Sequence, residues 1–223
     1  MFNLKKFLFS FALMFCLFSF ASEIFAYEKS IEDLSAKLNI SAEKMDEILK
    51  DGNKKFVPMV SSDKDFYINL FSSQENSDYM KYYGNGKIMN KNSSEKIFKR
   101  RVSRMWDFDK PRSLAFIVKE DGKSVGFVAA GPVDSSSCNP EMGIIVEKKS
   151  SGKGLGNFIV KKMVSVMQEL KNLGIYKYKI LISTIKPDNV ASRKAVLKAG
   201  FTTNERVTKT EFGYEKIYKY RFS

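Results

Sequence analysis

The sequence contains no histidine among its 223 residues. This absence excludes His-dependent catalytic triads, the usual zinc sites and histidine pH switches, so we expect no metal site. Cysteine is nearly absent as well, with Cys16 in an N-terminal apolar run and Cys138 far from it. If that run is removed, Cys138 has no intrachain disulfide partner. It is also a poor candidate nucleophile, because no histidine can activate its thiol.

Acidic residues are too few to balance the basic ones. The chain has 38 Lys and Arg against 25 Asp and Glu, a formal net charge of +13. This excess favours anionic partners such as phosphate-bearing cofactors, nucleic acid or an anionic membrane, but a solvated basic surface explains it equally well. Proline is scarce, and 43% of the residues are hydrophobic, which is enough for a folded core and argues against wholesale disorder.

The N-terminus has the three-part pattern of a secretory signal peptide. Lys5-Lys6 precede an apolar run over residues 7–20, and small residues follow, with cleavage expected after Ala21 or Ala26. We therefore expect residues 1–26 to direct export, to a periplasm or to the medium. The run is shorter than the roughly 20 residues of a membrane-spanning helix. An uncleaved membrane anchor is the alternative.

Residues 27–55 read as a helical N-terminal extension. Ser30 is a predicted N-cap with Asp33 at capping-box spacing, and a second helix is predicted from Ser41 to Gly52. The pair weakly resembles the core of a helix-turn-helix. A third helix is missing, and an exported protein would not meet its own chromosome, so a packing appendage or spacer is the better interpretation and nucleic-acid binding is not expected.

From residue 56 onward the pattern predicts one α/β (α+β) domain with a mixed central sheet flanked by helices. The predicted order is strand, two helices, three strands, helix, strand, helix and two strands. Asp121-Gly122 is a hairpin turn signal, and Ser93 or Ser94 is the expected cap of the second helix. The longest amphipathic helix is predicted over residues 155–173.

A glycine-rich turn, Ser151-Gly-Lys-Gly-Leu-Gly156, joins a predicted strand to this helix. Alternating glycines let a ligand approach the backbone, and the N–H groups and dipole of a helix N-terminus suit a pyrophosphate. Lys148, Lys149 and Lys153 add positive charge. A tight strand-to-helix connection is the alternative interpretation. The Walker and Rossmann patterns are both absent.

Three segments together resemble the GNAT superfamily of N-acetyltransferases, over about residues 56–220. Pro140–Val146 leading into Ser151–Gly156 is similar to its strand and pyrophosphate loop. Ile185–Phe201 is similar to its later helix, and its Asn189 and Ser192 resemble the branch that acetylates ribosomal-protein N-termini. Asp121–Phe127 is similar to its hairpin before the cofactor strand.

The resemblance implies that residues 56–223 bind acetyl-CoA as cosubstrate, without a metal. The acetyl group would pass in a ternary complex to a primary amine of a protein N-terminus, a lysine or a small molecule. Two departures matter: Ser151 stands where Gln or Arg is usual, and Val196 stands where many members have a Tyr as general acid. The cofactor-binding residues implied are Ile144, Ile145, Val146, Ser151, Gly152, Lys153, Gly154, Leu155, Gly156, Asn189 and Ser192.

The chemistry needs few groups. A lysine-like amine must lose a proton before it attacks, and Glu141 is the candidate base, directly or through a water. Ser192 is the candidate donor to the leaving thiolate, and backbone N–H groups of residues 143–146 are candidate oxyanion donors. Structural roles are the alternatives: a surface carboxylate for Glu141, a first-turn hydroxyl for Ser192 and a helix cap for Asn189.

Four aromatic residues lie in the region that lines the acceptor side in the family, namely Tyr79, Tyr82, Tyr83 and Trp106. Core packing explains Trp106 equally well. Export leaves a second functional hypothesis open. Acetyl-CoA is not expected outside a cytoplasm, so an exported binding or effector protein with a degenerate acetyltransferase fold is the alternative.

Overall fold

The computed structural model of the chain describes residues 22, 25–83, 86–133, 139–210 and 213–222. Most of the predicted signal over residues 1–26 lies outside this part, and so do Cys16 and Cys138. The described residues form one mixed sheet flanked by helices, which confirms the predicted fold class. No helix among them is long and apolar enough to span a bilayer.

The described strands form an eight-stranded sheet in the order β1-β2-β3-β4-β5-β6-β8-β7. Neighbouring strands are antiparallel except β5 and β6, which are parallel. The predicted order of elements along the chain is confirmed from β2 onward, apart from the additional one-turn helix α4, and β1 adds a short edge strand that the sequence pattern did not indicate. The strands are β1 (Lys50–Asp51), β2 (Lys54–Pro58), β3 (Leu114–Glu120), β4 (Lys123–Gly131), β5 (Glu141–Val146), β6 (Ile180–Ile185), β7 (Thr202–Thr210) and β8 (Gly213–Arg221).

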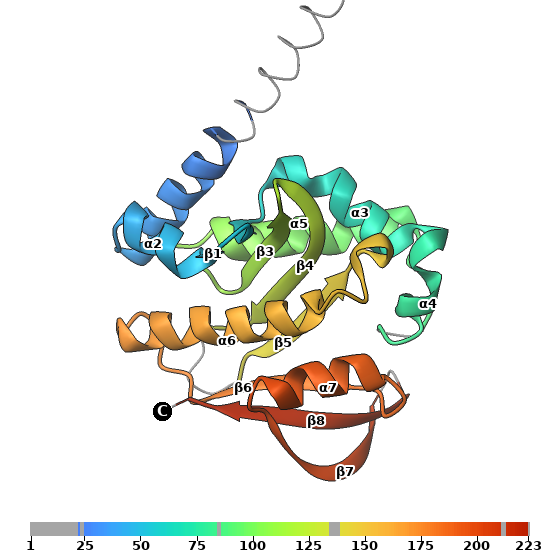
Figure 1. Cartoon of the computed structure of the whole chain (residues 1–223). Coiled ribbons are helices and arrows are strands. Elements are labelled where there is room, and N and C mark those ends of the chain that lie inside the picture. The colour runs from blue at the N-terminus through green and yellow to red at the C-terminus, as the bar shows by residue number, and fades with distance from the viewer. Residues whose placement is uncertain (1–21, 23–24, 84–85, 134–138, 211–212, 223) are drawn as a thin grey trace, which may run out of the picture.

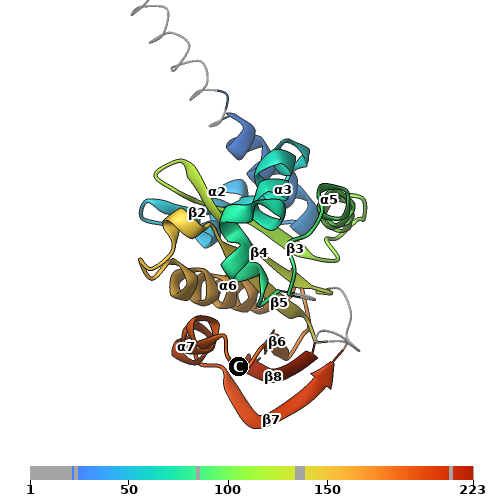
Figure 2. The ribbon, with the colours of Figure 1, turned by 90° about the vertical axis from the view of Figure 1, so that its right-hand side faces the viewer.

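Helices cover both faces of this sheet. A helix over residues 25–38 is followed by α2 (Ala42–Leu49), α3 (Lys64–Ser72), α4 (Ser77–Met80), α5 (Lys91–Trp106), α6 (Leu155–Asn172) and α7 (Val190–Lys198). Short 3-10 turns lie at Ser61–Asp63, Gln74–Asn76 and Lys148–Ser150. In Figure 1, α6 lies in front of β5. Figure 2 shows α6 and α7 along one side of the sheet and α5 along the other.

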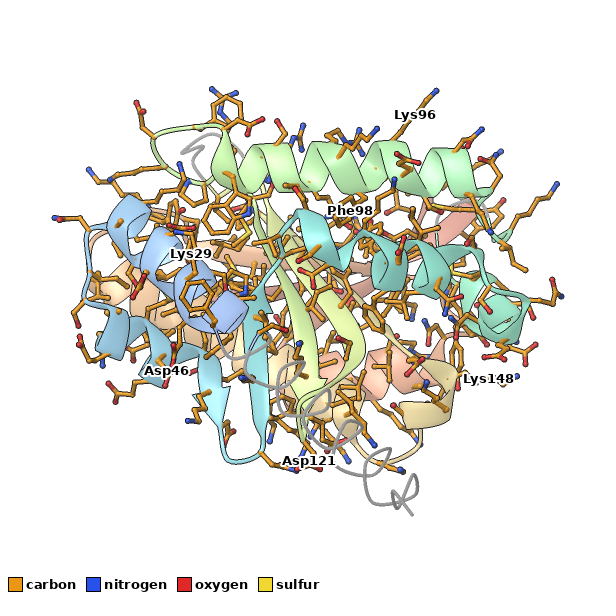
Figure 3. All side chains as sticks on the ribbon, turned by 90° about the horizontal axis from the view of Figure 1, so that it is seen from above. Lys29, Asp46, Lys96, Phe98, Asp121 and Lys148 are labelled. Atoms are coloured by element: carbon orange, nitrogen blue, oxygen red, sulfur yellow. The ribbon has the colours of Figure 1, made fainter. Side chains whose placement is uncertain are left out.

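An aromatic cluster joins the helices α3 and α5 to the sheet. The ring of Tyr67 stands edge-on to Phe127, with the centroids 5.0 Å apart, and lies 5.3 Å from the ring of Phe98. Figure 3 shows Phe98 on the inner side of α5 and Lys96 on its outer side. Because Tyr67 and Phe127 are almost fully buried, this cluster fixes the position of α5 over the sheet.

The N-terminal extension packs into the core of the same domain. Leu34 and Leu49, from its two helices, have no exposed surface. The predicted cap at Ser41 is confirmed, because its side chain accepts a hydrogen bond from the Lys44 N–H at 3.2 Å. The second helix ends at Leu49 and not at Gly52, because the next two residues pair with β2 as strand β1.

The predicted cap at Ser30 is wrong. The first helix already covers residues 25–38, so Ser30 lies inside it, and its hydroxyl donates a 2.8 Å hydrogen bond to the carbonyl of Tyr27. Asp33 lies one turn from Lys29, with their charged atoms 3.8 Å apart. The expected boundary between the signal and the extension, at residues 26 and 27, falls inside this described helix.

The cap of α5 also differs from the prediction. Asn90, three residues before the predicted serine, accepts a hydrogen bond from the Ser93 N–H at 2.8 Å. Ser94 is buried one turn into the helix, and its hydroxyl donates to the Asn90 carbonyl at 3.2 Å. By contrast, the predicted hairpin turn is confirmed, because Asp121 and Gly122 both have positive φ, at 51° and 78°. Asp121 lies at the tip of that hairpin (Figure 3).

A close approach between β4 and β5 requires glycine at position 126. A Cβ atom there would lie 2.7 Å from the carbonyl oxygen of Ile145, so the backbone would have to move. We expect Gly126→Ala to lower the free energy of unfolding by about 1–3 kcal/mol, as overpacking does. Gly143→Ala on β5 is the matched control, because its Cβ would meet nothing within 4 Å. Equal denaturation midpoints for the two variants would show that the close approach to the Ile145 carbonyl does not require glycine at position 126.

Candidate active site

The only parallel strand pair of the described sheet is open along most of its length. Strands β5 and β6 share a single register pair, Glu141 with Ile182, and the Ile182 N–H donates to the Pro140 carbonyl at 2.8 Å. By contrast, β5 pairs with β4 on its other side over its whole length, from Glu141 to Val146. The two parallel strands therefore separate beyond this pair, which leaves backbone groups of both strands available to a ligand.

A cavity of about 860 Å³ lies at this separation. Residues of α5 and of the β7–β8 hairpin line it on one side of the sheet. Val160 of α6 and Val196 of α7 line it from the other side. The cavity therefore passes between β5 and β6 and connects the two faces, a size and position suited to an extended ligand.

The cavity brings together the two predicted catalytic residues. Glu141, the first residue of β5, is exposed at its wall, and Ser192, in the first turn of α7, is half-buried there. Glu141 pairs with Gly131 of β4 on one side and Ile182 of β6 on the other, so the sheet fixes its backbone. Ile144, a predicted cofactor residue, lines the same cavity.

Asn189 holds Ser192 in place as well as lining the cavity. Its side-chain oxygen accepts a hydrogen bond from the Ser192 N–H at 3.2 Å, which makes Asn189 the N-cap of α7. The predicted cap role is therefore observed. The side-chain NH₂ group of Asn189 has no other partner among the described residues and is free to bind a ligand.

Removing this cap has a measurable consequence for stability. We expect Asn189→Ala to lower the free energy of unfolding by about 1 kcal/mol, because the first turn of α7 loses its side-chain acceptor. Asn189→Asp, which keeps an acceptor oxygen, is expected to retain most of that free energy. Chemical denaturation of both variants checks this, and an unchanged midpoint for the Ala variant would contradict the capping role.

The glycine-rich turn leaves the start of α6 open. Gly154 is the N-cap residue with φ 79°, and no side chain caps the helix there. Gly152 also has a left-handed conformation, φ 80°, so a side chain at either position would be strained. A Cβ at Gly156, whose φ is not positive, would meet nothing within 4 Å. The first N–H groups of this 18-residue helix therefore have no capping side chain among the described residues, as an anion site requires.

Two of the three lysines expected to support this turn have other partners. Lys148 pairs with Asp78 at 3.1 Å, beside α4 in Figure 3, and Lys149 pairs with Glu147 at 2.9 Å. Lys153 is exposed inside the turn and forms no ion pair in the described part of the chain. Of the three side chains, Lys153 is thus the one available to an anion at the α6 N-terminus.

The remaining predicted cofactor residues do not line the cavity. Ile145 and Leu155 are buried in the core. Val146 is half-buried at the end of β5, next to the turn. The hydroxyl of Ser151 donates to the Lys148 carbonyl at 2.8 Å and lies 2.7 Å from the Tyr79 hydroxyl, so Ser151 shapes the turn.

The aromatic residues expected on the acceptor side divide into two groups. Tyr82 and Tyr83 line the cavity, as the resemblance implied. Trp106 does not, because its indole N–H donates to the Met59 carbonyl at 2.7 Å and its ring packs against the core. Tyr79 contacts the glycine-rich turn and not the cavity. Trp106 therefore has the packing role that was its alternative.

Sequence reasoning missed four charged residues of the cavity, namely Arg100, Arg101, Arg104 and Glu215. The basic run at residues 99–101 was visible in the sequence, but it lies on a helix whose surface is otherwise rich in lysine. Glu215 is 8% exposed and accepts a 2.7 Å hydrogen bond from the Thr210 hydroxyl. Its burial depends on the β7–β8 pairing, which the sequence does not specify.

Arg101 is held by two tyrosines. Its Nε donates to the Tyr67 hydroxyl at 3.1 Å and one terminal nitrogen donates to the Tyr83 hydroxyl at 3.2 Å. Burial raises the pKa of Tyr67 to about 12, so its phenol is neutral near pH 7. Burial opposes the charge on Arg101, but its contacts with Tyr83 and Tyr67 leave the guanidinium pKa above its ordinary value. Arg101 is therefore a fixed cation.

Comparison with known proteins identifies the family. A model described as an acetyltransferase (GNAT) domain matches residues 55–202. No curated protein matches the chain in sequence. Among the described residues, no group of three or more Asp, Glu or Cys side chains could hold a metal ion.

Several solved structures share the fold. The Microcin C7 self-immunity acetyltransferase MccE, in complex with acetyl-CoA and AMP, is 18% identical, with a TM-score of 0.62 over 77% of this chain and 94% of that one. RimL, a ribosomal L7/L12 alpha-N-protein acetyltransferase with coenzyme A, is 11% identical, with a TM-score of 0.64 over 78% and 97%. Spermidine N-acetyltransferase from Vibrio cholerae, with CoA and spermine, is 14% identical, with a TM-score of 0.60 over 76% and 94%. At these identities the likeness establishes the fold, and the matched family model goes further: the chain belongs to the GNAT family of acetyl-CoA-dependent N-acetyltransferases.

Proposed function

We propose that this N-acetyltransferase transfers an acetyl group from acetyl-CoA directly to a primary amine bound in the cavity between β5 and β6. One observation carries the proposal: Glu141 and Ser192 line the same cavity, at the point where the two parallel strands separate. A carboxylate and a hydroxyl at one opening are the groups that proton transfer from an amine and to a thiolate requires.

The residues present fit acetyl-CoA. The open edges of β5 and β6 offer backbone groups to the amides of a pantetheine arm, and the side-chain NH₂ of Asn189 lies beside them in the cavity wall. The uncapped start of α6, with Lys153, offers N–H groups and a positive charge to a pyrophosphate. The first of these sites can hold the arm and the second the phosphates.

Each residue then has a defined task. Acetyl-CoA supplies the activated acetyl group as a thioester. Glu141 accepts the proton of the amine, directly or through a water. Backbone N–H groups of β5 that face the open edge stabilise negative charge on the acetyl oxygen, and the Ser192 hydroxyl donates to the leaving sulfur.

The acceptor class is tested with a panel of amines. The solved relatives named above include, by their names, an enzyme for spermidine and one for a ribosomal protein N-terminus, so the fold serves both small and protein amines. Release of free CoA thiol is measured with polyamines, amino acids, lysine peptides and N-terminal peptides. Turnover of one class by the parent protein supports the proposal, and no turnover of any class would favour a degenerate binding protein.

We also propose that the protein is exported through residues 1–26. The support is the sequence pattern, together with the attachment of the next residue: the Tyr27 hydroxyl donates to Asp46 at 2.5 Å, and Lys55 lies over its ring at 3.6 Å. Phe25, by contrast, is 68% exposed. The mass of the mature protein checks this, and an intact N-terminus would point to the membrane-anchored alternative.

A further inference from the structure

Three arginines of α5 face the same cavity as Glu141 and Ser192. Arg100, Arg101 and Arg104 are spaced one, three and four residues apart, which places them on one side of the helix. In the part of the chain that the structure describes, none of the three forms an ion pair. A cluster of three cations without a carboxylate partner is unusual on a cavity wall, because like charges repel.

Arg101 keeps unused hydrogen-bond donors toward the cavity. A guanidinium has five N–H donors, and the contacts with Tyr67 and Tyr83 use two of them. The other terminal nitrogen has no partner among the described residues. This nitrogen is not fully buried either. It is therefore accessible from the cavity, while the Phe127 ring, 5.2 Å from the guanidinium carbon, supports the other side.

The carboxylates of the cavity do not neutralise these arginines. Glu141 belongs to β5 and Glu215 to β8, and neither comes within 4.0 Å of an arginine nitrogen as an ion pair would. Glu215 is engaged by the Thr210 hydroxyl. The cavity thus has a basic wall on α5 and an acidic wall on the sheet, and the basic wall has the larger charge.

These arginines are also separate from the expected pyrophosphate site. The turn before α6 lies on the side of the sheet that α6 and α7 cover, whereas α5 covers the other side (Figure 2). The glycine-rich turn does not line the cavity. An anion bound at α5 is therefore best explained as part of the acceptor, on the side of the sheet away from the phosphates of the donor.

We propose that the acceptor carries, besides its amine, a carboxylate or phosphate that binds Arg101, Arg104 and Arg100. The inference deepens the proposed function and rests on it. The amine lies on the acidic wall beside Glu141, and the anionic group accepts charge-assisted hydrogen bonds from the guanidinium fork of Arg101. Arg100 and Arg104, which are exposed at the rim, attract and orient the same group.

Matched amines test this selectivity. The kcat/KM for acetylation is compared for 4-aminobutyrate against putrescine, for phosphoethanolamine against ethanolamine, and for a peptide with an acidic second residue against the same peptide with a basic one. We expect the anionic member to be favoured at least about tenfold in one pair, since hydrogen bonds between ionised groups are roughly twice as strong as those between neutral groups. A preference within one of the first two pairs indicates a small-molecule acceptor, and a preference within the peptide pair indicates a protein acceptor. Equal or reversed preference in all three pairs would overturn the inference.

Arginine variants locate the effect. Arg104→Gln and Arg101→Lys are expected to raise KM for the anionic acceptor about tenfold and to leave acetyl-CoA binding, measured by calorimetry, unchanged. Lys96→Gln is the control, because it removes one positive charge from the outer side of the same helix (Figure 3). If acetyl-CoA fails to bind the folded parent, the proposed function fails. If it binds and the arginine variants behave like Lys96→Gln, the inference alone fails.

A binding measurement decides the question even without turnover. Inorganic phosphate is titrated into the parent and into Gly156→Asp, whose α6 site is blocked, and the thermal unfolding midpoint is followed. We expect phosphate to raise the midpoint in both proteins. In the Gly156→Asp background, the added changes Arg101→Lys and Arg104→Gln should remove most of this rise, whereas Lys96→Gln should not. A phosphate effect that persists in the arginine variants of that background would contradict the assignment.

Discussion

Gly156→Asp is expected to weaken acetyl-CoA binding at least about 100-fold. Gly156 is the second residue of α6, and a side chain there would meet open space in front of the uncapped helix N-terminus. A carboxylate at this position would lie against the pyrophosphate. Two like charges about 4 Å apart repel by about 4 kcal/mol at an effective dielectric constant of 20. Calorimetric titration with acetyl-CoA measures the loss.

Gly156→Asn is the matched control, because it has nearly the same shape without the charge. Neither substitution should unfold the protein, since the φ of Gly156 is not positive and acidic side chains stabilise the first turn of a helix. We therefore expect Asp at 156 to leave thermal stability unchanged or slightly higher while binding is lost. Equal affinities for the Asn and Asp variants would show that the phosphates bind elsewhere.

Glu141→Gln is expected to lower kcat about 100-fold or more, because general-base catalysis contributes on the order of 10²–10⁴ in rate. The glutamine keeps the size of the side chain at the start of β5 but cannot accept the proton of the amine. Acetyl-CoA affinity should stay the same, since the backbone of β5 is unaltered. Steady-state kinetics at saturating acetyl-CoA, with calorimetry beside it, separates the two effects.

The pH dependence distinguishes a base from a binding group. An alkylamine with a pKa of about 10.4 carries a proton near pH 7 and loses it as the pH rises. The loss of kcat in Glu141→Gln, relative to the parent, should therefore become smaller as the pH rises, because more of the acceptor amine is already neutral. Glu32→Gln, an exposed carboxylate of the first helix, is the control and should match the parent. A deficit that stays constant with pH would assign Glu141 to substrate binding.

The parts of the site that lie near one another in sequence could be predicted. The turn from β5 to α6 and the Asn189 cap of α7 depend on residues within a few positions of each other, and they form as expected. Glu141 and Ser192 are far apart in sequence, yet both line one cavity, because β5 begins at Glu141 and its parallel neighbour β6 is followed by α7, whose first turn carries Ser192. For that pair, the resemblance to a family supplied what the residue pattern alone could not.

The parts that depend on distant contacts could not be predicted. Trp106 donates to Met59 across 47 positions, and Lys148 pairs with Asp78 across 70, so sequence spacing gave no sign of either. From the sequence, the arginines of α5 could not be distinguished from a solvated basic surface. Their position at the cavity depends on how α5 lies over the sheet. The first helix was divided at residue 26 for a different reason: the signal pattern and the helix pattern overlap there.

Above all, we propose that this chain binds acetyl-CoA at the opening between β5 and β6 and at the start of α6. The most direct test is calorimetric titration of acetyl-CoA into the folded parent protein, with Gly156→Asp beside it. We predict one-site binding with a micromolar dissociation constant in the parent and its loss in the variant. No binding by a well-folded parent, or equal binding by the variant, would contradict the account.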